Sequence, residues 1–252
     1  MSDIGFAQNW TNLFFINITP DAAKTWARIG AGISTTDPNG NEVVDDSNYY
    51  DGEGVADSEV TGGQPVISFT GHRKYGDAAQ DWIASKRLAY GSARRTDFMQ
   101  IGPDGTKLEG KCTIANIKDQ GGDANSKSDF SFNVRMNGRP SLTPGNKTEY
   151  PEQITCEAIT ISDVTPVTPE VTITPEDASD SLVYAIEDDS IAKVDAMGTI
   201  TPVKNGSTKL NIKSAVLPTV QCTVEVTVSG VQANSIETAS LKSAGATAGS
   251  DK

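Results

Sequence analysis

One strand-to-helix unit, residues 64–91, constrains the fold of this chain more than any other stretch. It opens with the run 66–70, where β-branched and aromatic residues adjoin, as is typical of a half-buried strand. Asp77 then starts a helix, with Gln80 at capping-box spacing and Gly91 as the expected stop. Short strand patterns and turns fill most of the remaining sequence. The sequence therefore predicts a mainly β fold, a β-sandwich with one flanking α-helix.

The periodicity of two segments supports this prediction. Within the helix, Trp82, Ile83, Leu88 and Ala89 supply an apolar side. The segment 130–136 alternates strictly, so that its four apolar residues face one way and its three polar residues face the other. We expect this segment to be the clearest strand of the protein.

The span between Ile29 and His72 contains no lysine or arginine but many acids. Glycines recur in it, so we expect a long acidic loop at 34–63 without regular structure. Loops of this length in compact domains tend to be functional. Calcium binding is one interpretation, but the sequence DPNGN at 37–41 places its glycine fourth, whereas an EF-hand loop needs it sixth. The remaining alternatives are a solvated acidic loop and a loop that orders against a neighbouring subunit.

Charge and composition exclude several classes of protein. The chain has 252 residues and a formal net charge of −12, so it repels nucleic acid phosphates. It has no apolar run long enough for a transmembrane helix, and its N-terminus lacks the pattern of a secretory signal. The three cysteines show no CxxC spacing, so we expect reduced, small buried side chains.

The sequence offers no catalytic constellation. It has a single histidine, His72, and no G-x-S-x-G, CxxC or HExxH motif. Carboxylates are abundant, but abundance without a motif does not indicate glycoside hydrolysis. We therefore expect no enzyme activity, no cofactor and no metal, and we interpret His72 as a hydrogen-bonded turn residue.

The composition changes near residue 154. Aromatic residues nearly vanish after Tyr150, and threonine, valine and isoleucine alternate with polar residues through Ser229. The expected domains follow from this change and are 1–150 with an N-terminal arm, a linker at 151–158, a β domain at 159–229 and a flexible tail at 230–252.

The second domain resembles a bacterial group-2 immunoglobulin-like domain. The match keeps its spacing over most of the domain, although the family's early strand is shortened here to 159–168. The family positions are held by Pro175, Ala178, Ile191–Asp195, Gly198, Ile200–Thr201, Val203, Gly206 and Leu210–Ile212. The resemblance implies an immunoglobulin-like β-sandwich that has no catalytic machinery and acts as a spacer, a stiffener or a weak sugar or surface binder.

The first domain resembles the major tail (tail-tube) proteins of long-tailed, siphovirus-type phages of Gram-positive bacteria. The resemblance rests on the segments 48–54, 61–63, 67–73 and 76–81. It implies a β-sandwich or barrel whose inner strands join those of five other copies in a hexameric ring. It also implies a long loop that reaches the adjacent ring and one helix outside the sheets.

This resemblance implies a structural role in the phage virion. Stacked rings form a tail tube that conducts the genome during ejection, and the C-terminal domain decorates the exterior and binds host-surface glycans weakly. The implied partners are other copies of the chain and the tape measure, distal and terminator proteins. DNA passes through the lumen without specific binding, and no membrane insertion is expected. The protein would be assembled in the host cytoplasm, and a fragment ending near residue 155 would still form tubes.

We expect the acidic loop to meet basic residues of a neighbouring copy, because no cation lies within the loop itself. The candidate interface residues are Asp45, Asp46, Tyr49, Tyr50, Asp51, His72, Arg73, Lys74, Arg94 and Arg95.

The alternative function is a bacterial surface or adhesin-like binding protein built around the immunoglobulin-like module. That class predicts an export signal and repeated modules, and the sequence shows neither.

Overall fold

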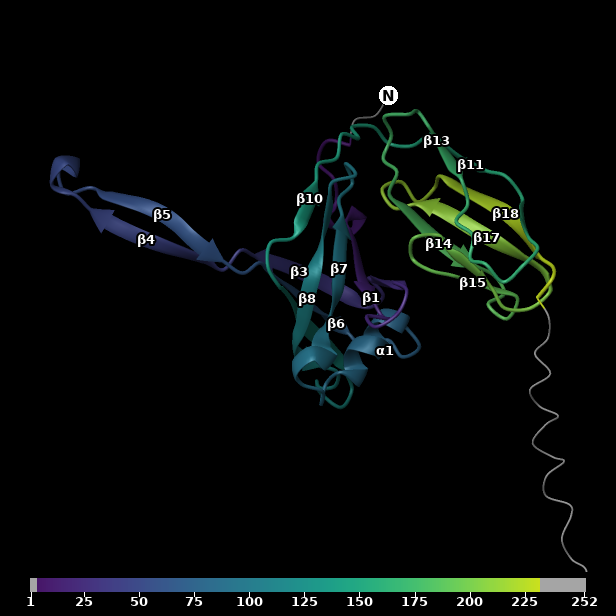
Figure 1. Cartoon of the computed structure of the whole chain (residues 1–252), viewed down its shortest axis with the longest axis horizontal. Coiled ribbons are helices and arrows are strands. Elements are labelled where there is room, and N and C mark those ends of the chain that lie inside the picture. The colour runs from purple at the N-terminus through teal and green to yellow at the C-terminus, as the bar shows by residue number, and fades with distance from the viewer. Residues whose placement is uncertain (1–3, 232–252) are drawn as a thin grey trace, which may run out of the picture.

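The structure is a computed structural model that describes residues 4–231. The chain is mainly β, with one α-helix among these residues, as the sequence predicts. Figure 1 shows a curled sheet in the centre, a two-stranded arm that projects from it, and a C-terminal group of sheets on the other side. The predicted flexible tail beyond residue 231 lies outside the described residues.

An eight-stranded antiparallel sheet forms the central part. Its strands follow the order β2 (Trp26–Ile29), β1 (Leu13–Asn17), β7 (Arg95–Ile101), β8 (Lys107–Lys118), β9 (Asp129–Met136), β6 (Val66–His72) and β3 (Ile33–Asn39). The short β10 (Ser141–Thr143) pairs with the start of β8. The sheet does not close, because β2 and β3 remain its two ends.

The sheet curls until its two halves face each other. Phe14 of β1 and Phe69 of β6 lie on strands with three others between them, which is four strand spacings or roughly 19 Å if the sheet were flat. Their ring centroids are instead 5.2 Å apart. Phe98 and Phe132 complete this aromatic centre. The interior of the curl is therefore the main core, and the alternating face predicted for 130–136 lies in it.

Strand β1 is buried on both faces. Phe14 and Ile16 point into the curled sheet, whereas Leu13 and Phe15 belong to a separate apolar cluster on its outer side. This second cluster, which we call the docking layer, joins the outer face of β1, β2 and β7 to the C-terminal part of the chain. Its members are Leu13, Phe15, Trp26, Met99 and Ala215, with Ile101, Val183, Ala196 and Met197 packed against them.

The helix α1 (Ala78–Ser85) begins where the sequence predicts and ends earlier. The side chain of Asp77 caps it by accepting a hydrogen bond from the backbone N–H of Gln80 at 3.0 Å. Ile83 is fully buried against the sheet, but Leu88 is 75% exposed. The prediction that the helix continues to Gly91 is wrong, because beyond Ser85 no apolar side chain reaches the core and the chain continues in turns.

Gln80 does not complete the predicted capping box. Its side chain is buried and bonds to other segments, donating to the carbonyl oxygens of Ala31 at 2.5 Å and His72 at 3.2 Å. Its carbonyl oxygen accepts from the backbone N–H of Lys74 at 2.7 Å. Gln80 therefore fastens the helix to the ends of β6 and to the turn before β3.

The acidic segment expected as an irregular loop is mostly regular structure. Its first part is β3, and the rest is the antiparallel hairpin β4 (Glu42–Asn48) and β5 (Ala56–Gly63), with a 3-10 turn, η2 (Tyr50–Gly52), at the tip. Gly62 and Gly63 do not interrupt β5, because both pair with β4 in extended conformation. The two strands pair with each other along the hairpin and leave their outer backbone groups to solvent.

The C-terminal part consists of short sheets around a core of its own. A four-stranded sheet has the order β12 (Ile159–Ile161), β18 (Gln221–Val228), β17 (Gly206–Ser214) and β14 (Leu182–Ile186). Two-stranded sheets join β11 (Gln153–Cys156) to β13 (Val171–Thr174) and β15 (Ala192–Val194) to β16 (Ile200–Pro202). The segment expected as a linker, 151–158, thus contains a paired strand, β11.

Candidate assembly surfaces

The hairpin β4–β5, which we call the arm, is the most exposed part of the described chain. Its strands pair only with each other, and among residues 42–63 only Ser47 is not exposed. Figure 1 shows the arm extending away from the sheet without touching another element. An isolated two-stranded hairpin is at best marginally stable in water. The arm is therefore a surface that would gain stability if another surface covered it.

The two faces of the arm differ in chemistry. Asp45 lies directly opposite Glu59, and Asp57 lies opposite Ser47 on the same face. We call Asp45, Asp57 and Glu59 the acidic face. Like charges directly opposite each other destabilise a strand pair. The acidic face therefore favours a basic partner.

The other face carries an apolar pair. Val44 lies opposite Val60, and both are more than half exposed. Further out, Asp46 accepts a 2.6 Å hydrogen bond from the Ser58 hydroxyl. Asp46 is thus satisfied within the arm, unlike the carboxylates of the acidic face.

The tip of the arm presents exposed aromatic rings. Tyr49 is 58% exposed and Tyr50 is fully exposed, and Val55 beside them is 72% exposed. Asp51 lies in the 3-10 turn between them. Exposed aromatic side chains of this kind are common anchors of protein interfaces. All five acidic and aromatic candidates of the sequence analysis thus lie on the arm.

Two of the predicted basic candidates are already engaged by their own chain. The guanidinium of Arg73 is buried, pairs with Asp81 at 2.5 Å and lies over the ring of Tyr75. Arg94 donates to the backbone carbonyl oxygens of Ala89 and Arg87, each at 2.6 Å. These contacts hold the turns around α1 together, so neither side chain is free for a neighbouring copy.

The other predicted basic candidates remain exposed. His72 ends β6 opposite Asp129 of β9, so it lies on a strand rather than in the turn that we expected. Lys74 follows it and is exposed. Arg95, the first residue of β7, is exposed, and its guanidinium has no hydrogen bond or ion pair with any residue that the structure describes.

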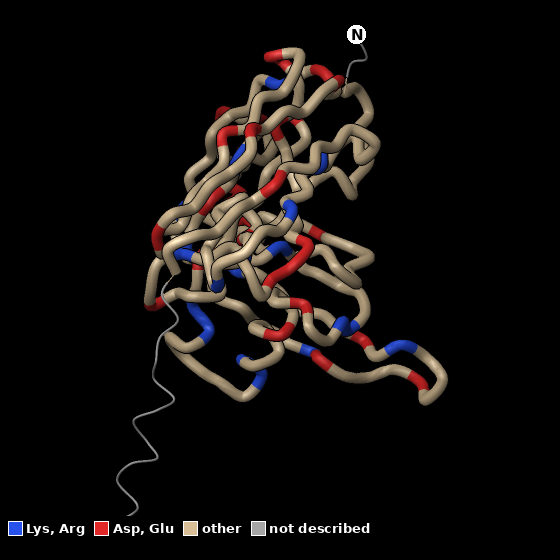
Figure 2. The backbone as a smooth tube through the Cα atoms, turned by 90° about the vertical axis from the view of Figure 1, so that its right-hand side faces the viewer, with Lys and Arg blue, Asp and Glu red and all other residues tan. Residues whose placement is uncertain are grey.

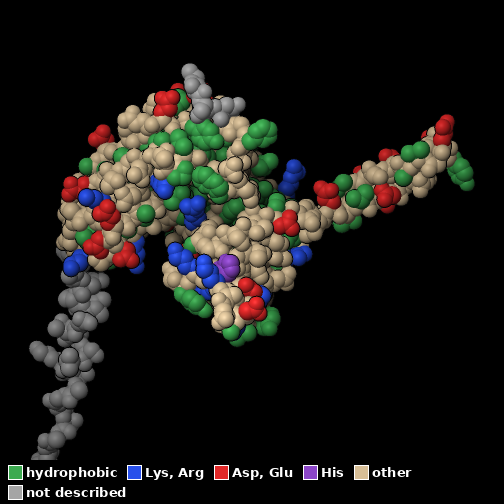
Figure 3. Space-filling model, turned by 180° about the vertical axis from the view of Figure 1, so that it is seen from behind, with side chains coloured by type: hydrophobic (Ala, Val, Ile, Leu, Met, Phe, Trp, Pro, Cys, Tyr) green, Lys and Arg blue, Asp and Glu red, His purple; other side chains and the backbone are tan. Residues whose placement is uncertain are grey.

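Arg95 belongs to a groove at the base of the arm, which we call the basal groove. It has a volume of about 1410 Å³ and runs over the outer side of the sheet beside the first residues of the arm. Arg95, Lys111 and Arg139 contribute cations to its lining. Figure 3 shows basic side chains near the base of the arm, which itself carries red and green side chains. Sequence reasoning missed Arg139, because its turn, Asn137–Pro140, indicates only the end of a strand.

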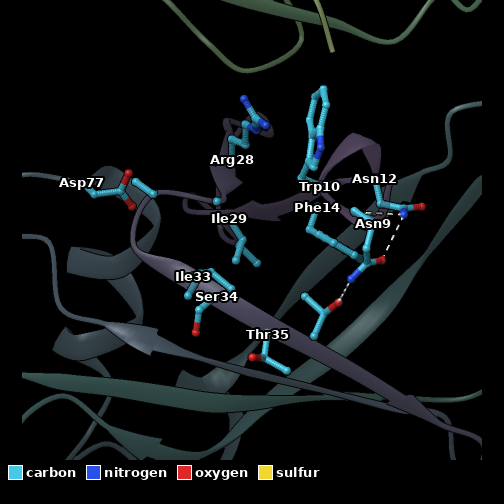
Figure 4. A pocket seen from close by; sticks show the side chains of 13 residues that line it. Asn9, Trp10, Asn12, Phe14, Arg28, Ile29, Ile33, Ser34, Thr35 and Asp77 are labelled. Atoms are coloured by element: carbon cyan, nitrogen blue, oxygen red, sulfur yellow. Dashed lines mark hydrogen bonds between the residues drawn. The ribbon is translucent and has the colours of Figure 1, made fainter. Parts of the chain in front are cut away.

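A second groove, the seam groove, lies between β2 and β3, the two ends of the open sheet. Its volume is about 540 Å³. Figure 4 shows Trp10 and Arg28 extending from it in the same direction, with Asn9 bonded to Thr36 at 3.3 Å on one side. Burial lowers the pKa of Arg28, and its guanidinium has no hydrogen bond or ion pair among the residues described. The seam therefore holds a further unpaired cation.

Other positively charged residues lie among acids. Figure 2 shows Lys and Arg interspersed with Asp and Glu over most of the molecule. On the outer face of β7, for example, Asp97 lies 2.9 Å from Lys111 and 3.5 Å from Lys24. The absence of any cation along the arm is thus a local property.

The described residues contain no group of three or more His, Cys, Asp or Glu side chains that could hold a metal ion. None of their helices has the length and apolarity required to cross a membrane. Cys112 is fully buried, which raises the pKa of its thiol to about 12, whereas Cys156 and Cys222 are half-buried.

Comparisons with known proteins agree with part of the sequence analysis. Residues 158–224 match the family of bacterial Ig-like domains (group 2), which confirms the resemblance of the C-terminal part to that family. No curated protein matches the chain.

Two solved structures of gene transfer agent particles have similar chains. One is described as the tail of an empty particle with C6 symmetry and is 20% identical, with a TM-score of 0.46. The other is a virion of a native particle and is 21% identical, with a TM-score of 0.42. Each likeness covers 54% of this chain and 98% of the other. At these scores, neither likeness establishes a function.

Proposed function

We propose that the protein is a structural subunit of a phage virion that polymerises as stacked hexameric rings into the tail tube of a siphovirus-type phage of Gram-positive bacteria. The tube conducts the genome into the host. The C-terminal Ig-like part lies on the tube exterior and binds host-surface glycans weakly. Subunits assemble in the host cytoplasm and act in the virion.

The arm is the observation that carries this proposal. It is a regular hairpin with exposed aromatic residues at its tip, an acidic face and an apolar pair, and it packs on no other element within residues 4–231. A protein that acts alone gains nothing from such a projection, which also risks aggregation. A subunit that docks on the next copy gains an anchor, and the sequence resemblance to tail-tube proteins implies a long loop that reaches the adjacent ring.

The open sheet supports assembly as well. β3 has a hydrogen-bonded neighbour only on the side of β6, so its other edge is free. Free edges are covered in native proteins, and closed cyclic symmetry covers them with identical copies. Six copies around an axis would give every free edge a partner.

The charge of the chain fits a conduit. A net charge of −12 disfavours strong binding of DNA, which must slide past without being held. The further partners in this proposal are the tape measure, distal and terminator proteins at the two ends of the tube.

Electron microscopy of the purified protein tests the proposal. We expect rings or tubes of sixfold symmetry in negative stain. A variant in which residues 42–63 are replaced by a short Gly-Ser turn should keep its circular dichroism spectrum and form neither rings nor tubes. Assembly without the arm would exclude the arm as the contact. A persistent wild-type monomer that binds glycans would favour the adhesin-like alternative instead.

A further inference from the structure

We propose that the basal groove of one copy receives the acidic face of a neighbouring copy's arm, with Arg95 and Arg139 as the cations that pair with Asp45, Asp57 and Glu59. This inference rests on the proposed function, since it requires that copies of the chain assemble. It keeps Arg95 from the cations that the sequence pattern favours, omits Arg73 and Arg94, and adds Arg139.

The arm supplies an excess of negative charge that its own chain leaves unbalanced. Asp45 and Glu59 face each other across the hairpin, and Asp57 lies two residues from Glu59 on the same face. None of the three has an ion pair with a described residue, and no lysine or arginine lies between residues 29 and 72. A cation placed between Asp45 and Glu59 would turn a repulsion into two attractions.

The basal groove supplies the opposite charge. Arg95 and Arg139 are exposed, and within the described chain neither guanidinium has a hydrogen bond, an ion pair or a ring contact. Lys111 adds a third cation, since its side chain remains 68% exposed although its Nζ is 2.9 Å from Asp97. Guanidinium groups bind carboxylates with two parallel hydrogen bonds, which is the strongest pairing available to the acidic face.

The acidic face does not line the groove of its own copy. The arm residues in the lining are Glu42, Val60, Gly62 and Gly63, and Val60 lies on the face opposite Glu59. Asp57 lies three residues beyond Val60, which corresponds to about 10 Å along a strand. The hairpin is paired along its length and extends away from the central sheet in Figure 1. The acidic face must therefore find this groove on a second copy.

A nucleic acid backbone is the competing occupant, because phosphates are also attracted to clustered arginines. The arm is favoured for two reasons. The groove is lined by Glu42 in addition to its cations. The phosphates of a duplex would meet this carboxylate, whereas a hairpin whose strands alternate in chemistry can present only its acidic face to the arginines.

Charge exchange tests the pairing. The double variants Asp45→Lys/Glu59→Lys and Arg95→Glu/Arg139→Glu should each lower the amount of protein in sedimentable tubes by roughly tenfold, because like charges then meet in the contact. The quadruple variant should recover tubes to within about twofold of the wild type, because attraction is restored with reversed signs. The matched control, Lys127→Glu/Lys193→Glu, reverses two exposed cations outside the groove and should assemble like the wild type.

Several outcomes would overturn the inference. If the quadruple variant assembles no better than either double variant, the two sets of charges do not meet. If Arg95→Glu/Arg139→Glu assembles normally but loses binding of a random DNA duplex at low salt, the groove binds nucleic acid. A wild-type protein that forms neither rings nor tubes overturns the proposed function together with this inference. Wild-type tubes without charge rescue overturn only the inference, and circular dichroism of each variant shows that it is folded.

Discussion

Strand β1 and the arm are opposite extremes of the same architecture. All five residues of β1 are buried, because one face lies in the curled sheet and the other lies under the docking layer. Both faces of the arm are exposed along β4 and β5. The comparison teaches that this chain separates two tasks. Strands that are buried on both faces, such as β1, stabilise the fold. Exposed apolar and unpaired acidic side chains are concentrated in the arm, which is buried on neither face.

Removal of the C-terminal part should have the largest effect, because it exposes the outer face of β1 and makes this strand resemble the arm. A fragment ending at Tyr150 exposes Leu13, Phe15, Trp26 and Met99, and each large apolar side chain loses burial worth about 1.5–3 kcal/mol. We expect the fragment to unfold at much lower urea concentration than the full chain and to bind a hydrophobic dye. This revises the expectation that such a fragment forms tubes unaided. An unchanged unfolding midpoint of the sheet would show that the docking layer is not formed in solution.

A single substitution in β1 should lower the free energy of unfolding far more than a single substitution in the arm. Phe15→Ala removes a fully buried ring from the docking layer and should lower the free energy of unfolding by about 3–5 kcal/mol. Tyr50→Ala at the exposed tip should change it by less than about 0.5 kcal/mol. Urea titrations of both variants measure the difference. Equal losses would remove the distinction between the two regions.

Gln80 should give an intermediate effect. Gln80→Ala leaves the carbonyl oxygen of Ala31 and the N–H of Lys74 without their partner. We expect the free energy of unfolding to fall by about 1–3 kcal/mol, the cost of one buried group left unsatisfied. Gln80→Glu keeps the acceptor for Lys74 but loses the donor to Ala31. Thermal unfolding should rank the wild type above Gln80→Glu, and a reversed order would contradict this account.

Asp97 should have the smallest effect on stability, and this effect should appear only in acid. Burial, the largest influence, raises the pKa of Asp97, but hydrogen bonds from Lys111 and Asn17 and the charge of Lys24 outweigh it, so the pKa is lowered. Asp97 therefore stabilises the fold above its unfolded pKa of about 3.9 and loses this contribution as the pH falls through its lower folded-state pKa.

The corresponding measurement is the free energy of unfolding between neutral pH and about pH 3. Asp97→Asn should flatten the decline below about pH 4, since the linked proton uptake is removed. An identical profile for the wild type and Asp97→Asn would contradict the role of this carboxylate.

The sequence predicts those strands of this fold that pack one face against the core and expose the other face to solvent. Phe130 and Phe132 alternate with polar residues, and both lie in the core as expected. Strand β1 has no such alternation, because its second cover comes from residues near Ala215, about two hundred positions away. Local pattern cannot reveal that contact.

The candidate surfaces are predictable only in part. The acidic and aromatic residues of the arm stand out because no cation interrupts them. Their arrangement on two faces follows from the register of the hairpin, which the sequence leaves open because neither face is apolar throughout. Composition alone also cannot separate Arg73, which is paired within its own chain, from Arg95, which is not.

The docking layer has a consequence for modular exchange of the Ig-like part. A foreign domain grafted in its place would need apolar side chains that pack on Phe15 and Trp26. Otherwise both residues would have to be replaced by polar ones at the same time. The hydrogen bond from the N–H of Ala196 to the carbonyl oxygen of Trp26, at 3.0 Å, would be lost as well. Cargo fused beyond Val231 leaves this cover in place, so the end of the chain is the better site for display.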